Sequence, residues 1–329
     1  MIYAAVIGLG IGEKHLQAIH GFRNFRVKYI YDINKKKSSQ IKKKYPDILI
    51  AKNENQIFLD NQVQLVCIAS YDNYHYQQIK KCIRYKKNII VEKPMCLTIQ
   101  QLKSIKQMVK KEKSIKIFSN LVLRTNALFQ YFRERIKNKK IFYIEADYLW
   151  GRGHKLFQWR SAIKRYSLTL GAGIHMIDLI MWLLNSKPSY VQGFSSNKIT
   201  KNSSYKKQGI VLAILKFPKN ILVKITANAS GIYNHYHEIK IFTEKETLSN
   251  SFLGSFSFKK NKNKASFNLI KKSYPDKENR KNLIRDFISC IFLKKKIKYQ
   301  TIKEQFDLMS VCFSIDKSVK LKKMIKVRY

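Results

Sequence analysis

The sequence predicts an α/β protein with two domains. Through residues 1–122, short apolar runs alternate with helical patterns, the order that builds a doubly wound parallel sheet with helices on both faces. From about residue 189, several long strands follow one another directly, which favours a large open, mostly antiparallel sheet. A chain of 329 residues is long enough for two cores. We therefore expect one domain over 1–122 and an α+β domain over 123–329, whose C-terminal helix is able to pack back on the first.

The first strand ends in a turn that contains three glycines, Gly8, Gly10 and Gly12, and a helix follows. The second strand stops at Asp32. Strand, glycine turn, helix, strand and acid is the order of a Rossmann unit, because glycines let the backbone approach a pyrophosphate and the helix N-terminus supplies N–H groups. The spacing departs from G-x-G-x-x-G, since Glu13 takes the third glycine position and Gly12 stands one residue early.

This order predicts a dinucleotide cofactor bound by the turn residues Gly8, Gly10, Ile11 and Gly12. Asp32 lies where a carboxylate reaches the adenosine ribose hydroxyls, and it would repel a 2′-phosphate. The acid therefore favours NAD. The lysines at 35–37 fit a 2′-phosphate instead, so NADP is the alternative.

The remaining elements of the first domain follow from apolar periodicity, breakers and caps. We expect helices over 35–45, 56–59, 74–85 and 98–111, and strands over 48–50, 64–69, 88–91 and 115–121. In the second domain we expect helices over 126–137, 174–183, 278–294 and 302–323, and strands over 141–149, 189–196, 208–217, 220–230, 235–244, 248–258 and 264–270.

The composition is strongly basic, with 65 Lys+Arg against 21 Asp+Glu and a formal charge of +44. The lysines are spread over almost every segment and no nucleic-acid motif accompanies them, so we interpret the charge as compositional bias and expect no specific nucleic-acid partner. No apolar run reaches the length of a membrane span, and no leader pattern precedes the first strand. We expect a cytoplasmic protein with no membrane partner.

The five cysteines lie far apart without a C-x-x-C pair, which is typical of buried thiols in a reducing compartment. His235 and His237 alternate on an expected strand, and we interpret them as surface or packing residues rather than as a metal pair. We expect no metal site.

Polar residues follow two strands of the expected parallel sheet. Ser70, Asn73 and His75 come after the fourth strand, and Glu92-Lys93-Pro94 ends the fifth. Ligands of open α/β sheets bind at the carboxyl ends of the strands, so these side chains are expected to touch the cofactor. The alternatives are a capped helix start around His75 and an ordinary surface turn at Lys93.

Gly173 and the residues after it open a helix of the second domain. His175 and Asp178 are three residues apart on this helix and share a face. A histidine beside an orienting carboxylate is the arrangement of a general base. The alternative is a core histidine whose hydrogen bonds are satisfied by its neighbours.

Taken together, the glycine turn followed by His15, Asp32, the 69–75 segment, Glu92-Lys93-Pro94 and the Gly-x-His-x-x-Asp of 173–178 resemble the Gfo/Idh/MocA family of NAD(P)-dependent oxidoreductases. The resemblance implies a Rossmann domain and a second domain whose open sheet carries the substrate and often the oligomer interface. It also implies that Glu92 and Lys93 belong to the cofactor site, that Lys93 contacts the nicotinamide ribose and the substrate, and that His175 is the acid/base at a sugar hydroxyl.

The sequence departs from this family at position 171. Many sugar-oxidising relatives carry an aspartate four residues before the histidine, and here that position is Gly171. The protein works with Lys93 and His175 alone, recruits another acid such as Asp147, or has lost redox turnover. In the last case it binds a nicotinamide nucleotide as a sensor or assembly partner.

The stretch 148–160 resembles branches of the family associated with sugar-nucleotide and surface-polysaccharide pathways. Arg152, Lys155 and Arg160 are suited to bind a carboxylate or phosphate, and with Asp178 they are the expected substrate-binding residues. We therefore predict an oxidoreductase that moves a hydride between a nicotinamide cofactor and a hydroxyl-bearing carbon of a sugar, sugar acid or nucleotide-sugar, and that forms a homodimer or homotetramer.

Overall fold

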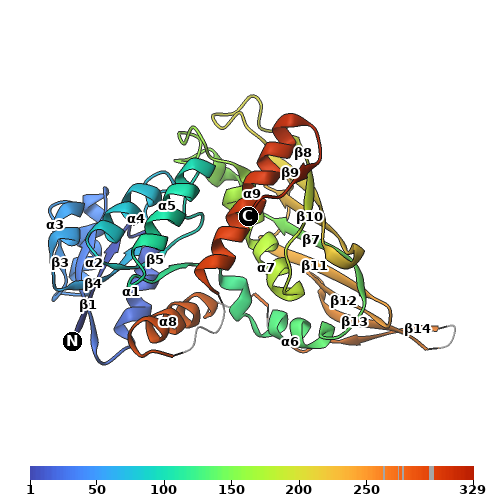
Figure 1. Cartoon of the computed structure of the whole chain (residues 1–329), viewed down its shortest axis with the longest axis horizontal. Helices are drawn as coiled ribbons and strands as arrows, with labels where there is room; N and C mark the ends of the chain where they lie inside the picture. Colours follow the sequence, from blue (N-terminus) through green and yellow to red (C-terminus); the bar gives the residue numbers. More distant parts are fainter. Residues whose placement is uncertain (262–263, 273, 276–277, 296–299) are drawn as a thin grey trace. The chain divides into compact units, whose positions relative to one another are not determined.

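The computed structural model describes residues 1–261, 264–272, 274–275, 278–295 and 300–329. It divides into two compact units, each with its own sheet (Figure 1). The first unit comprises Met1–Val122 and Lys277–Phe306, and the second comprises Leu123–Asp276 and Asp307–Tyr329. The predicted combination of a parallel sheet and a mostly antiparallel sheet is confirmed.

The first unit is built on a six-stranded sheet in the order β3-β2-β1-β4-β5-β6, with every neighbouring pair parallel. Its strands are β1 (Ile2–Ile7), β2 (Phe25–Tyr31), β3 (Leu49–Ile50), β4 (Val63–Ile68), β5 (Asn88–Val91) and β6 (Ile117–Ser119). The helices that connect them are α1 (Gly12–His20), α2 (Lys35–Lys44), α3 (Glu54–Leu59), α4 (His75–Arg84) and α5 (Ile99–Lys111). The strand order reverses between β1 and β4, which is where such sheets bind nucleotides.

The helix α8 (Asn279–Phe292) belongs to the first unit, although the sequence analysis placed residues 277–306 in the second domain. Its residues Leu283, Ile284 and Phe287 are buried in the core formed by β1, β2 and α1. Phe287 stacks on Phe118 of β6 with ring centroids 4.3 Å apart. The apolar face of α8 therefore completes a core that the first 122 residues leave open.

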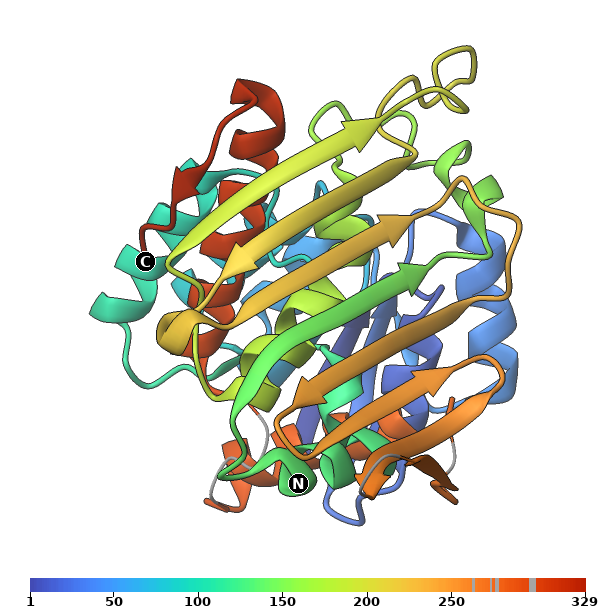
Figure 2. The same ribbon diagram turned by 90° about the vertical axis from the view of Figure 1, so that its right-hand side faces the viewer.

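The second unit is built on a nine-stranded sheet in the order β14-β13-β12-β11-β7-β10-β9-β8-β15. Its strands are β7 (Ile141–Leu149), β8 (Tyr190–Ser196), β9 (Ile210–Lys216), β10 (Leu222–Asn228), β11 (Tyr236–Thr243), β12 (Glu246–Ser251), β13 (Gly254–Asn261), β14 (Lys264–Leu269) and β15 (Ile325–Lys326). Only the β7–β10 pair is parallel among the described strands of this sheet. Its helices are α6 (Ala127–Ile136), α7 (Ile174–Leu184) and most of α9 (Ile302–Leu321), and α7 and α9 lie behind the sheet in Figure 2.

Two predicted strands differ from the structure. The run 248–258 is a hairpin of β12 and β13, because the chain turns at Phe252-Leu253 and Gly254 adopts a φ of +132°. Both turn residues before the glycine, Phe252 and Leu253, are apolar, so no polar residue marks the turn in the sequence. The run 115–121 is extended only over β6, and the chain then forms a 3-10 turn at Val122–Thr125.

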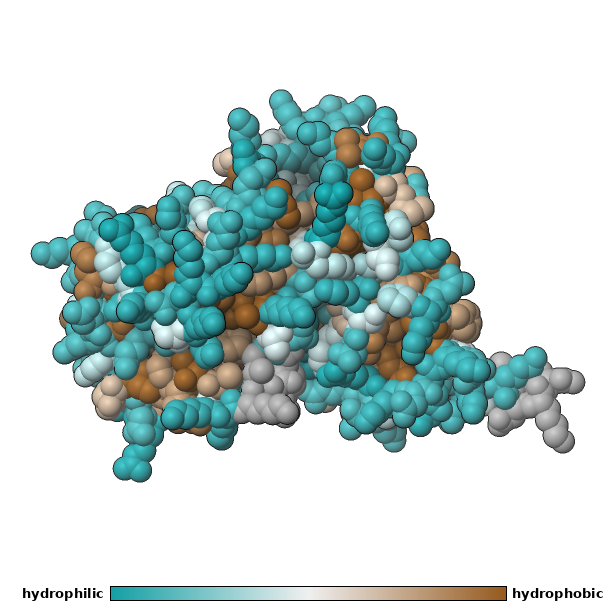
Figure 3. All heavy atoms as spheres, in the orientation of Figure 1, coloured by the Kyte–Doolittle hydropathy of each residue, from teal (hydrophilic) through white to brown (hydrophobic). Residues whose placement is uncertain are grey.

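Hydrophilic side chains cover much of the visible face of both units, with apolar residues scattered among them (Figure 3). This agrees with lysines that are distributed along the whole chain. None of the helices in the described part of the chain is long and apolar enough to cross a membrane.

Candidate active site

The glycine turn after β1 leaves room for a ligand at one glycine and is tightly packed at the other two. A Cβ atom on Gly8, whose φ is +85°, would lie 2.4 Å from the backbone of Ala69 and Ser70. A Cβ on Gly12 would lie 2.9 Å from Cγ1 of Val6. A Cβ on Gly10 would have no heavy atom within 4 Å, so the backbone there is open to a pyrophosphate. Gly12 thus provides the close helix–strand packing that the displaced third glycine would provide.

The first turn of α1 is suited to an anion. The residue before it, Ile11, offers no side-chain cap, so the first N–H groups of this nine-residue helix keep their positive dipole toward the turn. Glu13 does not oppose this, because its carboxylate is bound by Lys37 at 3.1 Å and Lys44 at 2.9 Å. The hydrogen bond to Lys44 outweighs burial and lowers the pKa of Glu13.

Asp32 lies at the end of β2 beside the glycine turn. Its carboxylate accepts a hydrogen bond from the main-chain N–H of Leu9 at 2.5 Å and another from Asn34 at 2.7 Å. The side chain is partly exposed, and the first residues of α2, Lys35 and Lys36, are exposed. The acid therefore stands beside the glycine turn, with two exposed lysines close behind it in the chain.

The ends of four parallel strands lie in one row. The register pairs Ile7 with Ile68, Ile68 with Val91, and Val91 with Ser119. Neighbouring strands are about 4.8 Å apart, so Lys93 lies at the same edge as the glycine turn, two strands away. Lys93 is partly exposed and is joined to Pro94 by a cis peptide bond.

The residues predicted after β4 have different positions. Asn73 is exposed and Ser70 is partly exposed, with its hydroxyl donating to Gln78 at 2.6 Å. His75 is fully buried, with Nδ1 2.7 Å from the carbonyl oxygen of Pro94 and Nε2 3.1 Å from that of Ser70. The His75 ring therefore joins the β4 end to the turn that carries Lys93.

The carboxylate of Glu92 points into the first unit. His15 Nε2 donates to it at 3.0 Å, Asn120 Nδ2 donates at 2.6 Å, and the Arg280 guanidinium lies 3.7 Å away. Burial opposes ionisation, but the hydrogen bond from His15 and the charge of Arg280 outweigh it and hold the pKa of Glu92 at about 2. His15 and Arg280 belong to α1 and α8, and Glu92 and Asn120 directly follow β5 and β6, so this cluster ties four elements together next to Lys93.

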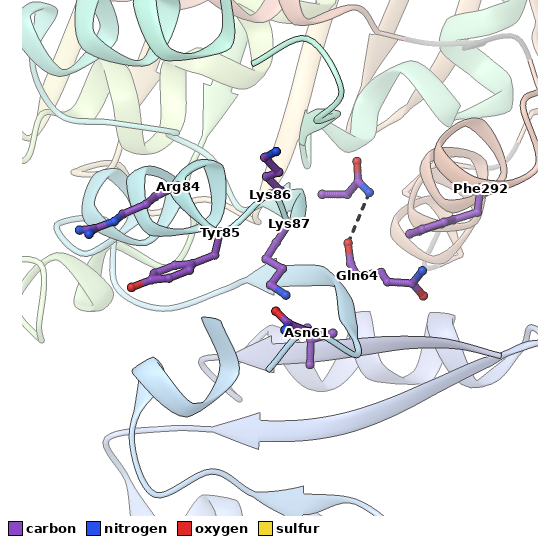
Figure 4. A pocket seen from close by; sticks show the side chains of 9 residues that line it. Asn61, Gln64, Arg84, Tyr85, Lys86, Lys87 and Phe292 are labelled. Atoms are coloured by element: carbon purple, nitrogen blue, oxygen red, sulfur yellow. Dashed lines mark hydrogen bonds between the residues drawn. The ribbon is translucent and has the colours of Figure 1, made fainter. Parts of the chain in front are cut away.

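A pocket of about 500 Å³ lies elsewhere on the first unit (Figure 4). It is lined by Asn61, Gln64, Arg84, Lys87 and Phe292, among others. Apart from Phe292 at the end of α8, its residues lie just before β4 and β5 or in their first residues. It therefore lies at the amino ends of the strands, opposite the edge that carries the glycine turn.

In the second unit, His175 lies in a cluster of rings on the helix-covered face of the sheet. Tyr148 of β7 is stacked parallel to it, with centroids 5.8 Å apart, and His237 of β11 lies edge-on at 6.0 Å. The register pairs His237 with Tyr148, and the Tyr274 hydroxyl forms a hydrogen bond with Nδ1 of His237. The His235 ring lies edge-on to Tyr148, with ring centroids 5.4 Å apart.

Sequence patterns do not predict this cluster. They indicate surface or packing positions for His235 and His237, and they do not mark Tyr148 or Tyr274 as site residues. The alternation of side chains within β7 and β11 shows which residues of each strand share a face. Only the pairing of the two strands brings Tyr148 and His237 together beside His175. Among the residues that the structure describes, no group of His, Cys, Asp or Glu could hold a metal ion.

Asp178, three residues after His175, is bound by Arg124. It is 1% exposed, and its carboxylate accepts hydrogen bonds from Arg124 Nε at 2.9 Å and Nη2 at 2.6 Å. This bidentate buried pair holds α7 to the 3-10 turn after β6. Asp178 is predicted above as a substrate-binding residue, and in the structure its carboxylate is buried in this pair.

Asp147 cannot serve as the acid missing at position 171. Successive residues of a strand face opposite sides, and Tyr148 faces His175, so Asp147 faces the other side of the sheet. There it pairs with Lys224 of β10 at 2.7 Å.

The predicted basic residues come together beside the aromatic rings. The Arg160 guanidinium lies over Trp159 at 4.1 Å and over Trp150 at 5.3 Å. The Arg160 guanidinium also donates to the main-chain carbonyl of Lys155 at 3.5 Å. Burial, followed by the charges of Arg152 and Arg160, lowers the pKa of Lys155. The ring centroids of Trp150 and Tyr148 are 6.4 Å apart, so these two rings connect Arg160 to His175.

Comparison with known proteins matches both units. Residues 2–120 match the model of the oxidoreductase family with an NAD-binding Rossmann fold, and residues 129–249 match the Gfo/Idh/MocA C-terminal domain. The myo-inositol 2-dehydrogenase of Thermotoga maritima is 22% identical over 244 residues, which cover 73% of this chain and 72% of that protein.

Solved structures share the whole fold. A levoglucosan dehydrogenase in complex with NADH and levoglucosan superposes with a TM-score of 0.86 at 16% identity, covering 100% of both chains. A UDP-N-acetylglucosamine 3-dehydrogenase from Acidithiobacillus ferrooxidans has a TM-score of 0.79 at 16% identity, covering 98% of this chain and 99% of that one.

Proposed function

The chain belongs to the Gfo/Idh/MocA family of NAD-binding oxidoreductases, and we propose that it oxidises or reduces a hydroxyl-bearing carbon of a sugar, sugar acid or nucleotide-sugar. When bound, the nicotinamide ring supplies the hydride acceptor or donor for this reaction. The observation that carries the proposal is the ring cluster around His175. Packing against Tyr148 and His237 holds the imidazole of the second unit in a defined orientation.

The first unit supplies the cofactor site. The open backbone at Gly10 and the uncapped start of α1 would hold the pyrophosphate, and Asp32 would hold the adenosine ribose. Lys93, two strands away at the same edge, would donate a hydrogen bond to the substrate oxygen and stabilise negative charge on it. His75 and Glu92 position Lys93 from beneath through Pro94 and β5.

The second unit supplies the proton acceptor. His175 takes the proton of the substrate hydroxyl during oxidation and returns it during reduction. Stacking on Tyr148 fixes the plane of its ring, and the buried Arg124–Asp178 pair fixes the helix that carries it.

Turnover assays test these roles. We expect NADH fluorescence titration to show binding, and one or more members of a panel of polyols, sugar acids and nucleotide-sugars to change nicotinamide absorbance. Lys93→Ala and His175→Ala should each lower kcat by roughly 10²–10⁴-fold. Lys103→Ala and His20→Ala, which alter exposed residues of α5 and α1, are matched controls. Full turnover by both site variants would exclude the mechanism.

NAD is the expected cofactor because the Asp32 carboxylate would repel a 2′-phosphate. The exposed Lys35 and Lys36 are the groups that would bind one. Dissociation constants for NADH and NADPH decide between them: we expect tighter NADH binding, and Asp32→Ser should narrow the difference. A wild-type preference for NADPH would reverse this assignment.

A nucleotide-sugar of a surface-polysaccharide pathway is the substrate class that the basic group favours. Arg152 and Arg160 are suited to bidentate contacts with a phosphate, and a structural relative is named for a UDP-sugar. Arg160→Ala should raise KM for a nucleotide-sugar at least tenfold while leaving KM for the free sugar unchanged. Equal effects on both substrates would remove this assignment.

The second candidate function is nucleotide binding without redox turnover, which the absence of an acid at Gly171 favours. It predicts NADH binding with no absorbance change for any sugar. A single active substrate excludes it.

We also propose that the protein is a homo-oligomer that uses the face of the nine-stranded sheet turned toward the viewer in Figure 2. Phe194 and Leu222 are 54% and 42% exposed on outward positions of β8 and β10. Light scattering should give a dimer or tetramer, and Phe194→Asp should shift it toward monomer. A monomeric wild type would contradict the proposal.

A further inference from the structure

Position 171 has no side chain, and the space beside it is filled by Tyr166. A Cβ atom on Gly171 would lie 1.8 Å from the Tyr166 hydroxyl oxygen and 2.4 Å from Cζ of its ring. The ring has little freedom to swing away, because Tyr166 is only 3% exposed. The Tyr166 phenol and any side chain at position 171 therefore exclude each other.

The Tyr166 hydroxyl consequently lies on the helix surface one turn before His175. Gly171 is part of the π-helical turn Thr169–Gly173, and α7 begins at the next residue. Residues four apart on a helix share a face, with Cβ atoms about 5–6 Å apart. A neutral hydroxyl thus stands on the His175 side of the helix, where an acidic side chain at 171 would place a negative charge.

Neighbouring groups hold Tyr166 against this turn. The Tyr205 ring, 1% exposed, lies edge-on to it at 6.0 Å. The main-chain N–H of Tyr166 donates to Ile163 at 3.1 Å, and that of Gly171 donates to Ser167 at 2.9 Å. The segment that carries Tyr166 and the turn that precedes His175 are therefore packed as one piece.

We propose that Tyr166 is a positioning residue of the dehydrogenase site. Its phenol replaces the side chain absent at position 171, fixes the turn from which His175 projects, and gives that histidine a neutral neighbour instead of an acid. This inference rests on the proposed function, because it assumes that His175 moves the substrate proton.

Removal of the hydroxyl and of the ring tests the role in two steps. Tyr166→Phe should lower kcat about tenfold with little change in KM, the loss of one hydrogen-bonding group. Tyr166→Ala should lower kcat roughly 10²-fold, because the turn under His175 loses its support. Tyr205→Phe is the matched control, since it removes another buried hydroxyl from the same ring pair, and its kcat should equal that of the wild type.

Exchange of the two positions tests the exclusion directly. Gly171→Asp should lower the apparent Tm by roughly 3–8 °C, because the carboxylate overlaps the phenol. The double variant Tyr166→Ala/Gly171→Asp should regain that loss and should exceed Tyr166→Ala in kcat at least tenfold. Its acidic limb of kcat/KM should move about one unit to higher pH, because a carboxylate beside an imidazole favours the charged ring.

These experiments distinguish a failure of the role proposed for Tyr166 from a failure of the proposed function. Wild-type kcat in Tyr166→Phe and Tyr166→Ala, while His175→Ala is inactive, would overturn the role of Tyr166 and leave the function standing. Wild-type turnover by His175→Ala would overturn the function. The Tm comparison needs no substrate, and an unchanged Tm for Gly171→Asp would refute the steric exclusion by itself.

Discussion

One acid in each unit illustrates two opposite electrostatic states. Glu92 of the first unit is surrounded by His15, Asn120 and Arg280, and its pKa is held at about 2. Asp316 of the second unit, on α9, lies beside the hydroxyls of Thr169 and Ser167, and burial raises its pKa to about 6. Burial acts in the same direction on both carboxyl groups. The difference therefore comes from the neighbours, because cations outweigh desolvation and hydroxyls do not.

The comparison distinguishes two kinds of acid. Some, bound to a cation, join elements of the fold, whereas the ionised form of others lowers the stability of the folded protein. Glu92 joins four elements beneath Lys93, and Asp178 joins α7 to the turn at Arg124. In both motifs the acid faces inward and is bound to a cation, while the neighbouring residue, Lys93 or His175, is the one predicted to act on the substrate. Asp316 has no such cation among the groups that shift its pKa.

The largest effect should follow from removing the cation of a paired acid. Arg124→Ala leaves the 1%-exposed Asp178 carboxylate buried without its bidentate partner. The free energy of unfolding should fall by about 3–5 kcal/mol, measured by urea denaturation. The control is Arg124→Met/Asp178→Leu, which replaces both charges by apolar groups and should recover most of the loss. No recovery would mean that packing, rather than the bare charge, dominates.

Neutralising Glu92 should have the next largest effect and should depend on pH. The folded pKa of about 2 lies below the ordinary glutamate value of 4.5, so ionised Glu92 stabilises the fold above pH 4.5 and this contribution is lost as the pH falls toward 2. Glu92→Gln should therefore lose about 3 kcal/mol at pH 7 and much less at pH 3. A difference that stays constant between these pH values would contradict the assignment.

Asp316→Asn should stabilise the protein, the opposite of Glu92→Gln. The folded pKa of about 6 lies above the ordinary aspartate value of 3.8, so the contribution of Asp316 to stability is most favourable below pH 3.8 and is lost as the pH rises through 6. The amide does not ionise, and since the side chain is partly exposed we expect a gain of about 1–2 kcal/mol at pH 8 and none at pH 4. Destabilisation at pH 8 would show that ionised Asp316 is paired.

The smallest effect belongs to an ion pair on the outer face of the second sheet. Lys224 and Asp147 form a 2.7 Å pair, but their side chains are 23% and 22% exposed. Lys224→Met should change the free energy of unfolding by about 0.5 kcal/mol, and the change should shrink in 1 M salt. A loss comparable with that of Arg124→Ala would remove the distinction between buried and exposed pairs.

Local pattern predicted most of the fold and the order of the motifs. The alternation in residues 1–122 fixes the parallel sheet, and the N-cap of Thr98, whose hydroxyl accepts from Gln101, appears as expected. The packing of α8 on the first unit could not be predicted from local pattern. Its apolar face indicates that the helix is buried, but not which element it packs against. The partner, Phe118, lies more than 150 residues earlier in the chain.

The candidate site was predictable only where one motif contains the whole interaction. Gly8, Gly10 and Gly12 belong to one turn, and their separate steric roles follow from it. The inward direction of Glu92 depends on His15 and Arg280, which come from distant elements. Likewise, the filling of position 171 depends on how the chain folds back after Arg160, which no periodicity encodes.

The late arrival of α8 constrains how this protein is made. Phe118 leaves the ribosome long before Phe287, and until then the first core lacks the ring that stacks on it. The nascent nucleotide-binding unit is therefore left with an open apolar surface while the entire β7–β14 sheet is synthesised, a period in which chaperones have a defined surface to occupy. Expression of residues 1–122 alone should accordingly yield an aggregation-prone fragment, and supplying α8 as a separate peptide should improve its solubility.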